Sequence, residues 1–306
     1  MSEDQPTNPE AKETAAPDKP EEKPGLWKGW VRPLLTVILI VTALRSSLID
    51  WNDVPTGSMI PTIREGDRIV VNKLAYGFNL PFNGPVVSVP FVPIAPFANP
   101  LDFLPGFYYA EPKRNDIVTF WKPGGFFEHH EQALRAAGAT ADYAQDRATI
   151  TDGGIRMVKR IVAGPGDTVE LRPAVEKFDG RDFRFSKLIL NGEEATYTRH
   201  GPLTLLEEVA GESRLVQYRR NDAAFINQSR GRLDPLTVSF GPYEVPEDQY
   251  LMIGDNRDNS ADGRFFLGVP RDQITGKAKF VAVSFKGSVF KPNWSRFFKG
   301  FAAKPD

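Results

Sequence analysis

The stretch Arg156-Met-Val-Lys-Arg-Ile-Val-Ala-Gly-Pro-Gly-Asp-Thr-Val-Glu-Leu171 contains two strand patterns and the turn that joins them. Arg156–Val162 is a short, largely apolar run, and Thr168–Leu171 alternates polar with apolar residues, as strands with one buried face do. Gly164–Asp167 combines glycine, proline and aspartate, the residues that favour a tight turn. We therefore expect the chain beyond Asp50 to be mostly β.

Further patterns of secondary structure lie on both sides of this unit. Strands are predicted at Arg68–Asn72, Asp116–Trp121, Leu188–Leu190, Tyr250–Ile253 and Ala278–Phe285. Asn191-Gly192 predicts a hairpin turn, because both residues tolerate a positive φ. One helix is predicted at Phe126–Ala137, ended by Gly138.

The composition excludes several kinds of site. The 306 residues carry 38 Lys and Arg against 39 Asp and Glu, so the charge gives no reason to expect nucleic acid as a partner. Cysteine is absent, which excludes disulfides, thiolate nucleophiles and cysteine-ligated zinc. A histidine-based triad or metal site would have to use His129, His130 or His200.

The N-terminal segment changes character near residue 25. Residues 1–25 are charged and proline-rich without any Val, Ile, Leu or aromatic residue, which predicts a disordered cytoplasmic tail. The uncharged run Pro33–Leu44 is shorter than the roughly 20 residues that span a bilayer. A core helix, a cleavable signal peptide and a membrane anchor are the alternatives. We favour a transmembrane anchor over 26–49, with Trp27 and Trp30 at the membrane interface.

Two later segments are unusually apolar or aromatic. Phe78–Pro112 is rich in Pro, Phe and Val, and either packs against the core or contacts lipid. Phe285–Pro305 mixes aromatic with basic residues. That composition suits an interfacial segment, and a tail packed on its own domain is the alternative.

Ser58 is the first candidate for a catalytic group. In Pro55-Thr-Gly-Ser-Met-Ile-Pro-Thr62 it follows Gly57, which allows close backbone approach and unusual dihedral angles. A serine hydroxyl is a poor nucleophile without a base. His200 lies in a predicted loop with no partner nearby in sequence, so the base has to be sought among the lysines.

Lys159 is the candidate base. Alternation along its strand places it on one face with Met157 and Ile161, where it is partly buried. Burial disfavours the ammonium form and lowers a lysine pKa, so the neutral amine could take the serine proton. An ordinary lysine at a sheet edge is the alternative.

Two polar clusters resemble metal sites only superficially. Glu128-His-His-Glu131 has adjacent histidines, which point to different sides of a helix, and no third ligand follows. Gly254-Asp-Asn-Arg-Asp-Asn-Ser-Ala-Asp-Gly-Arg264 has Phe266 where a calcium loop needs glutamate. We expect no metal, and we interpret the second cluster as a hydrogen-bonded network.

Together these segments resemble the type I bacterial signal peptidases. The matching motifs, in family order, are Pro55–Thr62, Gly66–Gly77, Lys113–Phe120, Met157–Asp167 and Gly254–Arg264. The resemblance implies that Ser58 is the nucleophile and Lys159 the general base. It also implies an oxyanion hole made by the Ser58 backbone N–H and the Thr56 hydroxyl, and a Ser260 hydroxyl that orients the Lys159 amine.

The resemblance also implies supporting and substrate-binding residues. Asp262 and Arg264 would form a supporting ion pair. Small apolar pockets, which favour Ala-x-Ala before the cut, would be lined by Val54, Met59, Ile63 and Val158.

The architecture implied is an antiparallel β catalytic core with an inserted smaller β domain, preceded by one N-terminal transmembrane helix. The core would comprise 50–171 and 249–290, the inserted β subdomain 172–248, and the basic aromatic tail 291–306. A signal peptidase I cleaves signal peptides from exported preproteins at the outer face of the bacterial cytoplasmic membrane. The expected partners are preprotein signal peptides and membrane lipid, with no nucleic acid and no cofactor. We expect a monomer near the secretion channel.

The sequence departs from the family pattern at Thr56, Asn115, Gly164 and Gly263, which replace the commoner Ser, Gly, Leu and Ser. None of these changes removes the Ser/Lys pair, although Gly263 bears on how tightly the final loop is held. The rival functions are a self-cleaving repressor, a dedicated maturation peptidase, an inactive homologue and a periplasmic binding module. No DNA-binding helical domain is visible in the sequence, which argues against the repressor.

Overall fold

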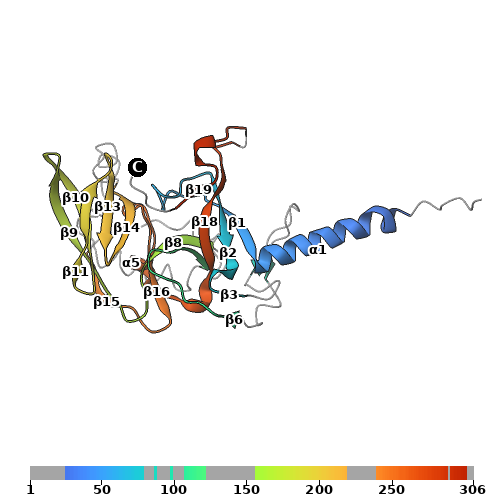
Figure 1. Ribbon diagram of the computed structural model, residues 1–306, viewed down its shortest axis with the longest axis horizontal. Helices are drawn as coiled ribbons and strands as arrows, with labels where there is room; N and C mark the ends of the chain where they lie inside the picture. The colour runs from blue at the N-terminus through green and yellow to red at the C-terminus, as the bar shows by residue number, and fades with distance from the viewer. Residues whose placement is uncertain are drawn as a thin grey trace, which may run out of the picture. The chain divides into compact units, whose positions relative to one another are not determined.

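Figure 1 shows the computed structural model, which describes residues 25–78, 86–87, 97–98, 107–121, 156–218, 239–288 and 290–301. The chain divides into two compact units, residues 1–40 and 41–306. The predicted helix at Phe126–Ala137 lies outside the described residues. The predicted tail over 1–25 also lies outside them, apart from Gly25.

The first described element is helical. Trp27–Val31 forms a π-helix, η1, and Arg32–Ser47 forms the α-helix α1. The prediction of a helix through residue 49 is wrong at its end, because Ile49–Asp53 forms the strand β1, paired with β2. Arg45 Nε, in the last turn of α1, donates to Asp50 Oδ1 of β1 at 2.6 Å. Among the described helices, none combines the length and the apolar character needed to cross a membrane.

The largest sheet has eight strands in the order β1-β2-β18-β7-β8-β16-β17, with β19 paired to β18. All of its described pairings are antiparallel. Besides β1, its strands are β2 (Asp67–Asn72), β7 (Ile117–Trp121), β8 (Arg156–Ala163), β16 (Gln249–Ile253), β17 (Val269–Pro270), β18 (Ile274–Ser284) and β19 (Lys299–Gly300). The five strands predicted in these regions are confirmed.

Residues 168–244 contribute two further antiparallel sheets. One has the order β11-β10-β9-β15, with β9 (Thr168–Phe178), β10 (Arg181–Leu190), β11 (Glu193–Glu194) and β15 (Phe240–Glu244). The other has the order β12-β13-β14, with β12 (Thr196–Arg199), β13 (Thr204–Val209) and β14 (Glu212–Gln217). An inserted subdomain over 172–248 stays a prediction.

The turn predicted at Asn191-Gly192 is confirmed. The two residues join β10 to β11 with φ values of 53° and 81°. The strands predicted at Thr168–Leu171 and Leu188–Leu190 are present but belong to the much longer β9 and β10. These two strands pair with each other from Val169 to Phe178, so their polar outer halves are held by the ladder rather than by burial.

The remaining described elements are short. They are η2 (Lys73–Ala75), β3 (Gly77–Phe78), β4 (Val86–Val87), β5 (Phe97–Ala98), β6 (Phe107–Tyr108), α5 (Gly263–Phe266), η5 (Arg271–Gln273) and η6 (Trp294–Arg296). The strand β3 pairs with β6, and β4 pairs with β5. The strands β4, β5 and β6 lie in the apolar stretch Phe78–Pro112, most of which is outside the described residues.

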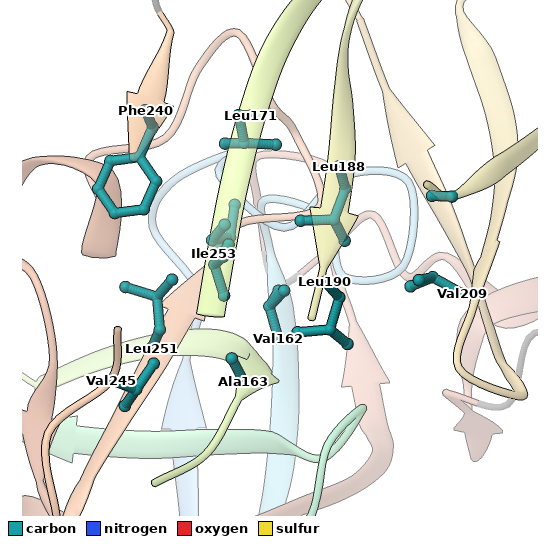
Figure 2. Close-up of a cluster of buried hydrophobic side chains, with 12 residues drawn as sticks. Val162, Ala163, Leu171, Leu188, Leu190, Val209, Phe240, Val245, Leu251 and Ile253 are labelled. Atoms are coloured by element: carbon teal, nitrogen blue, oxygen red, sulfur yellow. The ribbon is translucent and has the colours of Figure 1, made fainter. Parts of the chain in front are cut away.

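A buried apolar cluster joins the three larger sheets. Figure 2 shows Val162 of β8 and Ile253 of β16 beside Leu171 of β9, Leu188 of β10 and Val209 of β13. Packing of this kind fixes the sheets against one another. It also fixes the C-terminal end of β8, just beyond Lys159, and the end of β16, where the loop Gly254–Arg264 begins.

Candidate active site

Ser58 lies in the loop between β1 and β2. The base of the loop is closed by Val54 N, which donates to Asp67 O at 3.0 Å. Gly57 has no positive φ, so it does not use the left-handed conformations that glycine allows. A Cβ at this position would lie 2.8 Å from Ile60 Cδ1, the end of a side chain that can move aside.

The Lys159 amine meets the Ser58 hydroxyl, although the two residues come from distant parts of the chain. Lys159 Nζ lies 2.6 Å from Ser58 Oγ. Lys159 is only 3% exposed, and its strand neighbours Met157 and Ile161 belong to one apolar cluster. The predicted burial of this face of β8 is therefore confirmed.

The surroundings of Lys159 change its protonation. Burial lowers the pKa of the amine to about 8. The Asp262 and Asp255 carboxylates work against this shift, and the Arg264 guanidinium adds to it. A much larger fraction of this amine is neutral near neutral pH than for an ordinary lysine, so it can act as a base.

The loop Gly254–Arg264 packs directly on the Ser58 turn. Asn256 N donates to Ser58 O at 3.0 Å, and Asn256 Nδ2 donates to Gly57 O at 2.9 Å. A Cβ at Gly254 would lie 2.6 Å from Ser58 O and 2.1 Å from Ser260 Oγ, so only glycine fits there. The predicted hydrogen-bonded network in this loop is confirmed.

Asp262 and Arg264 form a buried ion pair with two contacts. Arg264 Nε lies 2.8 Å from Asp262 Oδ1, and Arg264 Nη2 lies 2.9 Å from Asp262 Oδ2. Burial disfavours the Asp262 carboxylate, but Arg264 and a hydrogen bond from Gly254 N outweigh burial and lower its pKa. Asp262 therefore stays charged beside Lys159.

The structure does not join Ser260 or Thr56 to the Ser58–Lys159 pair by hydrogen bonds. The Ser260 hydroxyl is buried and has no partner at hydrogen-bonding geometry among the described residues. It does lie close enough to Asp262 to help lower the pKa of that carboxyl. Thr56 is exposed, two residues before Ser58.

The four residues predicted to line substrate pockets lie in one cluster. Val54, Met59 and Ile63 are 7%, 1% and 0% exposed, and Val158 is half-buried against them. Val54 and Val158 thus offer some accessible surface. Met59 and Ile63 are almost fully buried in the same cluster.

One buried ion pair near the site was missed by the sequence analysis. Arg160 Nε and Nη2 lie 2.8 and 2.7 Å from the two oxygens of Asp255, which also accepts from Thr62 Oγ1 at 2.5 Å. These contacts link β8, the loop that carries Ser58 and the loop Gly254–Arg264. The sequence did contain a signal for this pair. Arg160 lies on the apolar face of its strand opposite Lys159, and a buried charge needs a partner.

A second buried lysine lies in a different environment. Lys73 Nζ is 3.9 Å from Asp50 Oδ2, and the same carboxylate is bound by Arg45 and Arg156. Burial lowers the pKa of Lys73 to about 8, with the Arg156 charge as the next cause and Asp50 opposing. In this cluster the amine faces a carboxylate and two guanidinium groups.

The described part of the chain contains no candidate metal site. Among those residues, no group of three or more His, Cys, Asp or Glu side chains could hold a metal ion. His129 and His130 lie outside the described residues, and His200 is exposed in the turn before β13.

Comparisons with known proteins point to one family. A sequence model of the family described as "Signal peptidase, peptidase S26" matches residues 27–283. The signal peptidase I of Pseudomonas aeruginosa is 30% identical over 272 residues, covering 85% of this chain and 74% of the relative. That of Haemophilus influenzae is 29% identical over 294 residues, covering 88% and 74%. A crystal structure of a signal peptidase I from Enterococcus faecalis aligns with 22% identity over 55% of this chain and 96% of that chain, at a TM-score of 0.24, too low to support an argument.

Proposed function

Because this chain belongs to the signal peptidase family, peptidase S26, we propose that Ser58 and Lys159 are the residues with which it cleaves signal peptides from exported preproteins. The family is one of serine proteases, so the chain is a serine endopeptidase. The observation that carries the proposal is the 2.6 Å contact between Lys159 Nζ and Ser58 Oγ, made by a lysine that is 3% exposed.

The proposed reaction begins with proton transfer. Neutral Lys159 takes the proton of the Ser58 hydroxyl as Ser58 Oγ attacks the scissile carbonyl carbon and the carbonyl oxygen becomes an anion. The Ser58 backbone N–H and the Thr56 hydroxyl donate to that oxygen. Collapse breaks the C–N bond, and the Lys159 ammonium returns its proton to the leaving amine. Water then hydrolyses the acyl-serine ester with Lys159 again as base.

The substrate is proposed to bind as an added strand. β16 pairs with β8 from Arg160 onward, whereas Arg156–Lys159 pair only with β7 among the described residues. This leaves one edge of β8 open next to Ser58. An extended peptide can hydrogen-bond to such an edge while alternate side chains enter pockets.

The pocket residues support a preference for small side chains. The cluster around Val54 and Val158 is closely packed, and Met59 behind them is 1% exposed. A large side chain would have to displace buried groups, and overpacking of a well-packed core costs on the order of 1–3 kcal/mol. We therefore propose cleavage after Ala-x-Ala-like sequences, in which the side chains nearest the cut are methyl groups.

Signal peptidase I proteins are typically membrane-anchored. For this chain we propose that the helix over 26–47 is the anchor, with a cytoplasmic N-terminus and the β unit on the outer side of the cytoplasmic membrane. The support is the exposure of Leu34, Val37 and Ile40, which are 60%, 57% and 52% exposed on α1. Lipid and preprotein are the proposed partners, and the protein is proposed to act as a monomer near the secretion channel.

The test compares wild type, Ser58→Ala and Lys159→Ala, purified in detergent, on a preprotein with an Ala-x-Ala site. Mass spectrometry of the products locates the cut, and circular dichroism shows that each variant is folded. The proposal expects cleavage at that site by wild type and none by either folded variant. An inactive wild type on several preproteins, or cleavage by Lys159→Ala, overturns it.

A further inference from the structure

Asn256 holds the peptide group that precedes the nucleophile. The residue is 0% exposed and its Nδ2 donates to Gly57 O at 2.9 Å. Gly57 O also accepts from Ile60 N at 3.2 Å, so its direction is fixed by two donors. A carbonyl held in this way cannot rotate without breaking both contacts.

The carbonyl of Gly57 and the N–H of Ser58 belong to one planar peptide group. In a trans peptide these two groups point in opposite directions. Fixing Gly57 O therefore aims the Ser58 N–H away from Asn256. Within the described residues that N–H donates to no other group, so it is available to a ligand.

We infer that Asn256 is a positioning residue that sets the oxyanion-hole donor of Ser58. The inference rests on the proposed function, because it uses Ser58 as the nucleophile and its N–H as an oxyanion donor. Electrostatic stabilisation of this kind depends on donors that are already aimed before reaction. Asn256 contacts the nucleophile turn at the backbone carbonyls of Gly57 and Ser58, so it acts through the Gly57–Ser58 peptide.

The orientation of the Asn256 amide follows from its neighbour. With the amide turned over, Asn256 Oδ1 would face Gly57 O, and two acceptors at that distance repel. In the orientation observed, Oδ1 is buried without a partner among the described residues. The donor is therefore the functional half of this side chain. Asn256→Asp, which has the same shape without that donor, tests it directly.

The backbone of Asn256 is held from outside the site. Gln217 N at the end of β14 donates to Asp255 O at 2.8 Å, and Arg257 N donates to Gln217 O at 2.9 Å. The Arg257 guanidinium in turn binds Glu207 of β13 at 2.7 and 2.8 Å. The three-stranded sheet thus sets the position from which Asn256 reaches the nucleophile turn.

The test measures kcat and KM of wild type, Asn256→Ala, Asn256→Asp and the matched control Asn259→Ala on the preprotein. Asn259 is an exposed asparagine in the same loop, and only its backbone N–H contacts Asn256, at 3.0 Å. Removing one oxyanion donor costs about 10²–10³ in kcat, and a residue that only aims the donor should cost less, about 10–100-fold. We expect that loss in kcat with KM within about twofold, and wild-type values for Asn259→Ala.

A second measurement distinguishes a misdirected Ser58 N–H from a general disturbance of the active site. A peptide aldehyde forms a tetrahedral adduct with Ser58, so its affinity should fall by the same factor as kcat/KM in Asn256→Ala and Asn256→Asp. The acid limb of the pH profile should stay in place in Asn256→Ala, because this change neither adds nor removes a charge near Lys159. If Asn256→Ala does not fold, Asn256→Ser takes its place and is held to the same expectations.

Three outcomes overturn the inference while the proposed function stands. They are equal kcat for Asn256→Ala and Asn259→Ala, a loss confined to KM, and an aldehyde affinity that does not change while kcat falls. An inactive wild type, or an active Ser58→Ala, would instead remove the proposed function on which the inference rests.

Discussion

Two of the described lysines in the unit 41–306 are buried, and they differ in what each amine faces. Lys159 is 3% exposed and Lys73 is 8% exposed. Burial lowers the pKa of each to about 8. Lys159 Nζ lies 2.6 Å from the Ser58 hydroxyl, whereas Lys73 Nζ lies 3.9 Å from the Asp50 carboxylate.

This difference teaches that a lowered pKa alone does not identify a catalytic lysine. Perturbed pKa values occur in structural ion clusters as well as in active sites. A base needs a proton to take, and Asp50, held charged by its cationic neighbours, has none to offer. Ser58 has one. The partner of the amine, rather than its burial, separates the two roles.

The sharpest way to break the comparison is to remove each amine in turn. Lys159→Met should lower kcat/KM by at least about 10³-fold, because general-base catalysis contributes about 10²–10⁴-fold and no other base contacts Ser58 in the described part of the chain. Lys73→Met should keep activity within about threefold of wild type, a small effect on that scale. Preprotein cleavage rates of the two folded variants decide this. Equal losses would mean that the distinction between the lysines is wrong.

A second test concerns stability around Lys73. Burial opposes the Asp50 carboxylate, but Arg156, Lys73 and Arg45 together lower its pKa. Asp50→Asn leaves three cations without their shared carboxylate and should reduce the free energy of unfolding by about 2–3 kcal/mol, somewhat less than a fully buried pair, because both arginines are partly exposed. Urea unfolding measures this loss.

The matched control for Asp50→Asn is Asp53→Asn, three pairs further along the same strand. Asp53 is 70% exposed in its salt bridge to Arg68, so its loss should cost at most about 0.5 kcal/mol. The contribution of Asp50 is present at neutral pH and is lost only as the pH falls through its lowered pKa. A similar cost for both variants would contradict the account of this cluster.

A third and smaller effect sharpens the account of Lys159. Among the charged groups that act on Lys159, Asp262 is the main one that raises its pKa. Asp262→Asn should therefore move the acid limb of kcat/KM to lower pH, since the amine loses its proton more easily. Asp50→Asn should leave the acid limb of kcat/KM at the wild-type pH. A limb that moves to higher pH in Asp262→Asn would contradict the assignment.

Much of the fold was predictable because strands with a buried face have apolar residues at regular spacing in the sequence. The strands β2, β7, β8, β16 and β18 each present apolar residues at strand spacing, and each lies where it was predicted. The strand β1 carried no such signal. Its Ile49 is 56% exposed and Asp50 is buried only because three cations surround it, a condition that no local pattern records.

The candidate site was predictable as a set of residues but not as a geometry. Ser58 and Lys159 followed from their motifs and from alternation along β8, and their 2.6 Å contact required the fold. Asn256 was missed because its partner is a backbone carbonyl, which leaves no mark in sequence. The role predicted for Ser260 toward Lys159 stays a prediction, since its buried hydroxyl has no partner at hydrogen-bonding geometry among the described residues.

The most direct test of the central claim is the pH dependence of kcat/KM for preprotein cleavage by wild type and Lys73→Met. In the proposed mechanism cleavage requires neutral Lys159, so activity should rise as the pH increases through about 8 and be lost below it. Lys73→Met should show the same limb at the same pH, because its lysine takes no part in the reaction. A limb that disappears in Lys73→Met, or a wild-type profile that is flat between pH values of about 6 and 9, would contradict a neutral Lys159 as the general base.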